Sequence, residues 1–113
     1  MVNNLENISD EEFNQLQEKI EDLFTSGKYE QVMPDFDKII GHVVDEIEHC
    51  GWRAHGLLKD GKKDEAIEFH KKITQLEPVL FKYREQKAIA LENLGRVTEA
   101  KSLREKNENK DLH

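Results

Sequence analysis

The sequence predicts an all-α protein made of antiparallel helix hairpins, with about six helices in a single stack. Gly27, Gly61 and Gly95 lie 34 residues apart, and each separates two segments of helical pattern. A fixed period of this length is typical of stacked helix hairpins. Charged residues make up 36% of the chain and only two prolines occur, a composition that favours exposed amphipathic helices over a sheet.

The first helix is predicted to begin after Ser9, because Ser9 and Glu12 have the spacing of a capping box. Apolar residues then recur at intervals of three and four, which gives one apolar stripe; they are Phe13, Leu16, Ile20, Leu23 and Phe24. Gly27 is expected to end this helix in the left-handed conformation.

The second and third helices are predicted on either side of a boundary near residue 44. Val32, Phe36, Ile39, Ile40 and Val43 form the apolar side of the second helix. Pro34 is expected near the start of that helix or at a kink, because it removes an amide donor. The third helix is expected at 45–58, although only Gly41 and Gly51 interrupt the pattern between the two.

Three further helices are predicted after Gly61. Asp64 is expected to cap a helix at 64–76, which the pair Glu77-Pro78 would end. A fifth helix follows at 79–94, and Thr98 is expected to cap a sixth.

Residues 61–78 resemble the second half of a tetratricopeptide repeat, with a turn glycine, a small residue, an aromatic residue and a closing proline. The positions that the three units share are Val32, Ala66 and Ala100; Leu23, Leu57 and Leu91; and Ile20, Ala54 and Ala88. The resemblance covers about residues 13–106 and implies a short right-handed array. The chain departs from the family at Lys19, Arg53 and Lys87, where leucine is usual, and at Val44, where the first unit lacks a closing proline.

The expected organisation is one domain at 9–107, with units at 13–46, 47–80 and 81–107. Residues 1–8 are expected to be flexible and 108–113 to form a disordered tail. No apolar run approaches the ~18 residues that span a bilayer, and no secretory signal is visible. A single cysteine fits a cytoplasmic protein. The net charge of −7 argues against nucleic acid and favours a basic partner.

The resemblance implies a non-enzymatic protein-interaction module without a cofactor, because first helices of such repeats line a groove that binds peptides. The groove residues carried over from the family are Asn14, Gln17, Glu21, His55, Lys59, Lys82, Glu85 and Ile89. Thr25, Glu48 and Glu92 complete that lining. The last helix is expected to expose one side of Val97, Ala100 and Leu103, which offers a surface for a homodimer.

Two other functions remain open at this point. An acidic chain could be an inhibitor or immunity-type protein that neutralises a basic toxin or nuclease. His42, Glu46 and His49 share one helical stripe beside Cys50, which could instead make a metal or thiol sensor. The simpler interpretation is a solvated polar face for the histidines and a small, half-buried residue between helices for Cys50. Trp52, Phe69 and Phe81 are expected in the core rather than as exposed anchors.

Overall fold

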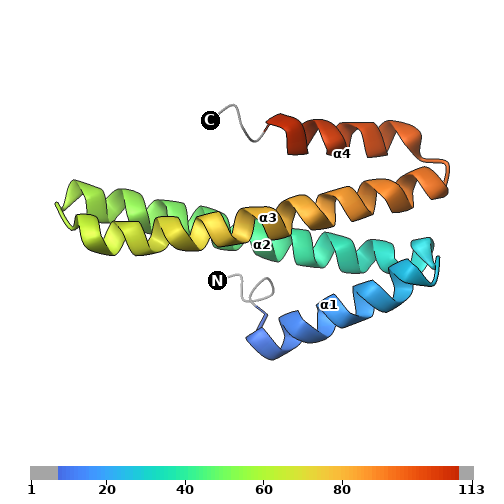
Figure 1. Ribbon diagram of the computed structural model, residues 1–113, viewed down its shortest axis with the longest axis horizontal. Helices are drawn as coiled ribbons and strands as arrows, with labels where there is room; N and C mark the ends of the chain where they lie inside the picture. The colour runs from blue at the N-terminus through green and yellow to red at the C-terminus, as the bar shows by residue number, and fades with distance from the viewer. Residues whose placement is uncertain (1–7, 110–113) are drawn as a thin grey trace, which may run out of the picture.

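A computed structural model describes residues 8–109, which form four helices and no strand. They are α1 (Asp10–Thr25), α2 (Tyr29–Lys59), α3 (Lys63–Asn93) and α4 (Val97–Asn109). Figure 1 shows α2 and α3 as a long antiparallel pair, with α1 beside α2 and α4 beside α3 over the same half of the pair. The all-α prediction is therefore confirmed, whereas the prediction of about six helices is wrong.

The 34-residue period corresponds to three identical turns. At the first, the amide of Lys28 donates to the carbonyl of Leu23 at 2.9 Å, and the amide of Gly27 donates to Phe24 at 3.1 Å. These two bonds define a Schellman motif, which needs a residue with positive φ; Gly27 supplies it with φ of 75°. The same pair of bonds recurs at Gly61 and Lys62 and at Gly95 and Arg96.

The error in helix number arises where no turn of this kind exists. The predicted second and third helices are one helix, α2, because Val44 and its neighbours include no residue that breaks a helix. Gly41 and Gly51 only lower helix propensity, by about 1 kcal/mol each. Packing against α3 along the whole of α2 outweighs that loss.

Pro78 likewise does not end a helix. It lies inside α3, so the predicted helices at 64–76 and 79–94 are continuous. A proline within a helix removes one hydrogen bond, here the one that the carbonyl of Thr74 would accept, and costs about 3 kcal/mol. The unbroken α2 packs alongside and holds both halves of α3 in line.

The helix ends agree with the sequence at α1 but not at α4. Ser9 accepts a hydrogen bond from the amide of Glu12, and the Glu12 carboxylate accepts one from the amide of Ser9, so the capping box is confirmed. Helix α4 begins at Val97, which places Thr98 inside its first turn rather than at its cap. Most of the expected flexible N-terminus and tail lies outside the described residues; Ile8 packs against the core, and α4 reaches Asn109.

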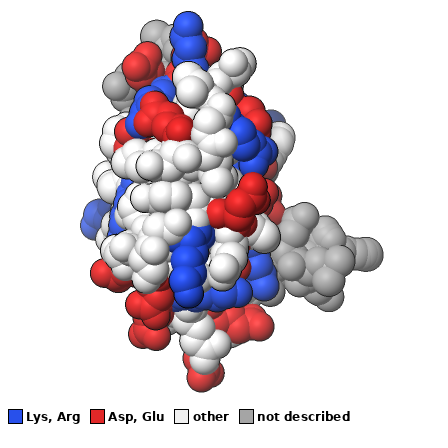
Figure 2. Space-filling view, turned by 90° about the vertical axis from the view of Figure 1, so that its right-hand side faces the viewer, with Lys and Arg blue, Asp and Glu red and all other residues white. Residues whose placement is uncertain are grey.

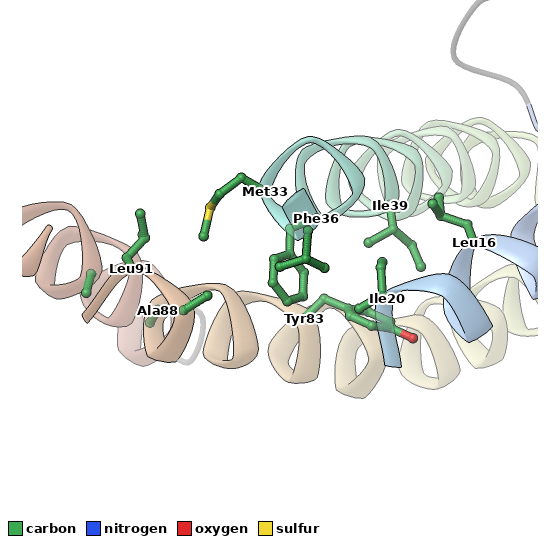
Figure 3. Packing of buried hydrophobic residues seen from close by; sticks show 11 residues of the cluster. Leu16, Ile20, Met33, Phe36, Ile39, Tyr83, Ala88 and Leu91 are labelled. Atoms are coloured by element: carbon green, nitrogen blue, oxygen red, sulfur yellow. The ribbon is translucent and has the colours of Figure 1, made fainter. Parts of the chain in front are cut away.

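The core lies where all four helices meet. Figure 3 shows Phe36 between Met33 and Ile39 along α2 and next to Tyr83 of α3, with Ile20 of α1 near the Tyr83 ring. Two of the positions that the three units share are buried in every unit. The exposed fractions are 0% or 1% at Ile20, Ala54, Ala88, Val32, Ala66 and Ala100. These six shared positions face inward as the sequence predicts, whereas Leu23 and Leu57, at the third shared position, are half-buried.

The other half of the α2–α3 pair extends beyond α1 and α4 (Figure 1). We call this two-helix segment, residues 44–78, the arm. The fully buried side chains in it are small, namely Cys50, Ala54 and Ala66. Its larger apolar side chains are half-buried or exposed, because the arm consists of two helices with no third helix to cover them.

Candidate partner-binding groove

A groove of about 540 Å³ lies between α1 and α3. Asn14, Gln17 and Glu21 of α1 line it together with Lys82 of α3, so the structure brings together four of the predicted partner-binding residues. Thr25 lines it as well. On α1 these residues recur every three or four positions and therefore share one face.

The groove combines an apolar floor with polar walls. Ile20 and Tyr83 are buried in the core, and their groove-facing atoms, with those of Phe24, form the apolar part of the lining. The Lys82 ammonium lies 5.1 Å from the centroid of the Tyr83 ring, within the range of a cation–π contact. The walls carry side-chain amides and carboxylates, which can bond to peptide N–H and C=O groups.

The sequence pattern did not identify five of the lining residues, namely Glu18, Ile20, Phe24, Tyr83 and Gln86. Gln86 could have been found, because it follows Lys82 by one helical turn. Phe24 and Tyr83 carry no such signal, because a buried aromatic residue and a groove-lining one have the same sequence pattern. Phe24 and Tyr83 both pack in the core and line the groove, and this depends on the distance between α1 and α3.

Three predicted groove residues lie on α3 but do not line the groove. The Glu85 carboxylate accepts a hydrogen bond from Nε of Arg104 at 3.0 Å, so Glu85 points toward α4. Glu92 pairs with the same guanidinium, and these two bonds raise the pKa of Arg104. Ile89 is half-buried on α3.

His55 and Lys59 lie away from the groove, on the arm. The cause is the continuous α2, which carries them past the end of α1 instead of folding back beside it. His55 borders a different surface hollow, of about 600 Å³, together with Glu48, Gly51 and Trp52.

The histidine and cysteine cluster does not assemble. Cys50 is 1% exposed, whereas His49 is exposed on another side of α2. His42 packs against Phe13 of α1, with the two ring centroids 5.4 Å apart. Among residues 8–109, no three His, Cys, Asp or Glu side chains are grouped closely enough to hold a metal ion. Cys50 therefore occupies the position expected of a small residue between helices.

Ion pairs tie the helices together around the core. Nζ of Lys19 on α1 lies 3.4 Å from Oδ1 of Asp35 on α2, and the Lys87 ammonium of α3 pairs with the Asp37 carboxylate of α2. Figure 2, which looks onto the end where the turns at 27 and 95 lie, shows groups of both signs around an uncharged central band. No single charge dominates this face.

The expectation that the aromatic residues are core is wrong for two of the three. Trp52 is 75% exposed and Phe81 is 44% exposed. Phe69 is half-buried, with the Arg53 guanidinium 5.5 Å from its ring centroid. On α4, Val97 is 61% exposed, as the sequence suggested, but Ala100 is fully buried.

No family model, curated protein or solved structure matches this chain. The tetratricopeptide resemblance therefore stays a prediction. Within residues 8–109, none of the helices combines the length and the apolarity that crossing a bilayer requires.

Proposed function

We propose that this chain is a non-enzymatic interaction module that binds a segment of another protein in the groove between α1 and α3. The observation that carries the proposal is the convergence of Asn14, Gln17, Glu21 and Lys82 on one groove. The sequence alone predicts these four residues to face a bound peptide. The resemblance supports this reading, because α1 and the second half of α3 match the first helices of units one and three.

The lining indicates the chemistry of the bound segment. Side-chain amides of Asn14, Gln17 and Gln86 can pair with the backbone of an extended peptide. An apolar side chain of that peptide would cover Phe24 and Tyr83. Glu18 and Glu21 outnumber Lys82, so a lysine or arginine next to the apolar side chain would add a charge-assisted hydrogen bond.

Site-specific photocrosslinking tests the proposal. A photoreactive amino acid placed at Gln17 or Gln86, both in the groove, is expected to capture the same protein from native lysate. The matched control is Gln75, an exposed position on the arm in α3. Equal capture of that protein at Gln75 would contradict binding in the groove.

Charge reversal then measures the contribution of the groove to affinity. Glu21→Lys is expected to weaken binding of the captured protein about tenfold or more, because a carboxylate that pairs with the ligand becomes a repelling cation. Glu65→Lys, an exposed change on the arm, is the control and should leave the dissociation constant unchanged. An unaltered affinity in Glu21→Lys, with unaltered circular dichroism, would reject the groove.

A basic toxin or nuclease as the partner would be recognised by its salt dependence. Its affinity would fall steeply as salt rises, since the net charge of −7 would then steer association. Binding through the amides and the apolar floor would change little with salt.

A further inference from the structure

One face of the arm carries a largely exposed stripe on α2. Arg53 packs over Phe69 of α3, and Cys50 and Ala54 are buried, so these residues mark the side of α2 that faces α3. A second set of residues, spaced by three and four, lies on another side of the helix and shares one face. We call it the α2 stripe; its members are Asp45, Glu48, Gly51, Trp52, His55 and Lys59.

A projection and a hollow lie side by side at the middle of the stripe. Trp52 is 75% exposed, the largest value among the exposed large apolar residues described. Next to it, Gly51 leaves the helix surface open, because a Cβ built there would meet nothing within 4 Å. Glu48, Gly51, Trp52 and His55 border a shallow hollow that is widely open to solvent. An exposed tryptophan beside a glycine hollow is a surface suited to packing against another helix.

The polar residues of the stripe are divided between its two halves. The half before Gly51 carries the acceptors Asp45 and Glu48, and the half after Trp52 carries the donors His55 and Lys59. None of these four takes part in an ion pair of the described residues, whereas several carboxylates around the core do. The stripe is therefore complementary to its own reversed copy.

We propose that two copies of this chain associate through the α2 stripe, with the two α2 helices antiparallel about a two-fold axis between Gly51 and Trp52. In such an isologous contact each pairing occurs twice. Trp52 of each copy enters the hollow at Gly51 of the other, and Glu48 of each copy faces the other's His55. Lys59 then lies beside Asp45 of the second copy, so unlike groups meet at both ends.

This contact leaves the groove between α1 and α3 free, because the groove is lined by α1 and α3 and α1 lies beside the other half of the α2–α3 pair (Figure 1). A dimer would then present two grooves, and a ligand with two binding segments would gain avidity. The dimer itself does not depend on the proposed function.

The oligomeric state of the full chain is the first test, measured by sedimentation in about 0.15 M salt, where charges are screened beyond about 8 Å. Trp52 is the only tryptophan, so its fluorescence reports the contact directly. A rise in mass with concentration is expected, together with a blue shift of the emission as the indole leaves water. If the protein stays monomeric at concentrations up to about 1 mM, the dimer dissociation constant exceeds that value and the proposal is overturned.

Two substitutions separate loss of the dimer from loss of the fold. Trp52→Ala is expected to raise the dimer dissociation constant at least about thirty-fold, as removal of a central aromatic residue does. Gly51→Leu fills the hollow and should also abolish the dimer, while the monomer becomes more stable because leucine favours the helix more than glycine does. A Gly51→Leu protein that dimerises like the wild type would overturn the proposal.

Charge exchange tests the antiparallel pairing. Glu48→Lys is expected to weaken the dimer about tenfold or more, because the His55 N–H of the second copy loses its carboxylate acceptor. Adding His55→Glu to that variant should restore the dimer, since the introduced lysine of each copy would pair with the introduced glutamate of the other. Failure of this rescue would reject the pairing.

The exposed start of α4 offers the competing surface. Val97→Glu should leave the dimer intact if the α2 stripe forms the contact. Dissociation of Val97→Glu, with Trp52→Ala still dimeric, would overturn the proposal and place the contact at α4.

Discussion

The rings of Phe36 on α2 and Tyr83 on α3 lie with their centroids 6.5 Å apart and their planes at 53°. Phe36 is fully buried and Tyr83 is 2% exposed, and the Phe24 ring of α1 meets Phe36 edge-on at 6.0 Å. This contact therefore joins the core to the groove, because Phe24 and Tyr83 also line the groove. The spacing of α1 and α3 depends on it.

Phe36→Ala is expected to destabilise the protein by about 3–5 kcal/mol, since it leaves a large cavity where three helices meet. Urea unfolding followed by circular dichroism measures this loss. The matched control is Ile67→Ala on the arm, where the side chain is 48% exposed and the loss should stay below about 1 kcal/mol. Similar losses in both variants would contradict the position of the core.

Pro78→Ala is expected to stabilise the protein, by up to about 3 kcal/mol, because Pro78 lies inside a continuous helix and alanine restores the missing hydrogen bond. The midpoint of urea unfolding measures the gain. If the chain turned at Pro78, as the sequence suggested, the substitution would be neutral or destabilising. The sign of the change therefore distinguishes one continuous α3 from two separate helices.

The two incorrect helix boundaries show what a single sequence can predict here. The turns at Gly27, Gly61 and Gly95 depend on local backbone conformation, which the glycines indicate directly. At Val44 the local sequence contains no residue that breaks a helix, and only the 34-residue register predicted an end there. Continuity through Pro78 depends instead on the partner helix, because α2 packs beside α3, and a local pattern contains no information on that support.

The same cause limits the prediction of the site. Asn14, Gln17 and Glu21 line one groove because a shared helical face is a local property that a sequence indicates directly. The prediction that His55 and Lys59 join them requires each unit to fold back on the previous one. In the structure α2 runs on, and both lie on the arm. Their exposed position beside Trp52 follows only from the three-dimensional arrangement.

A pair of glycines on the arm separates backbone strain from packing. A Cβ added at Gly56 or at Gly61 would meet nothing within 4 Å, but only Gly61 has positive φ, at 78°. Gly61→Ala is expected to destabilise by about 1–2 kcal/mol, the cost of a left-handed L-residue. Gly56→Ala should stabilise by about 0.5–1 kcal/mol, because it lies within α2. Thermal unfolding of the two variants should therefore shift in opposite directions.

Ala66→Leu tests the close approach of the two arm helices. Ala66 has no exposed surface although the arm consists of only two helices, so its burial reflects contact between α2 and α3 themselves. A leucine is expected to push them apart at a cost of about 1–3 kcal/mol. Gln75→Leu, on an exposed position of α3, serves as the control for added apolar volume. Unchanged stability of Ala66→Leu would mean that the arm helices are farther apart.

The Glu99 carboxylate at the start of α4 gives a pH-dependent prediction. It accepts hydrogen bonds from Nε and Nη2 of Arg96 at 2.8 and 2.9 Å, and these bonds lower the pKa of Glu99 below its ordinary value. A lowered pKa means that the folded state favours the carboxylate, so this stabilisation is present above the ordinary pKa and is lost as pH falls through the lowered one. In a carbon-detected NMR titration, Arg96→Gln is expected to move the Glu99 midpoint upward. Arg104→Gln is the control, because Arg104 pairs with Glu85 and Glu92 instead. A midpoint that stays in place in Arg96→Gln would show that the Arg96 hydrogen bonds do not set the pKa of Glu99.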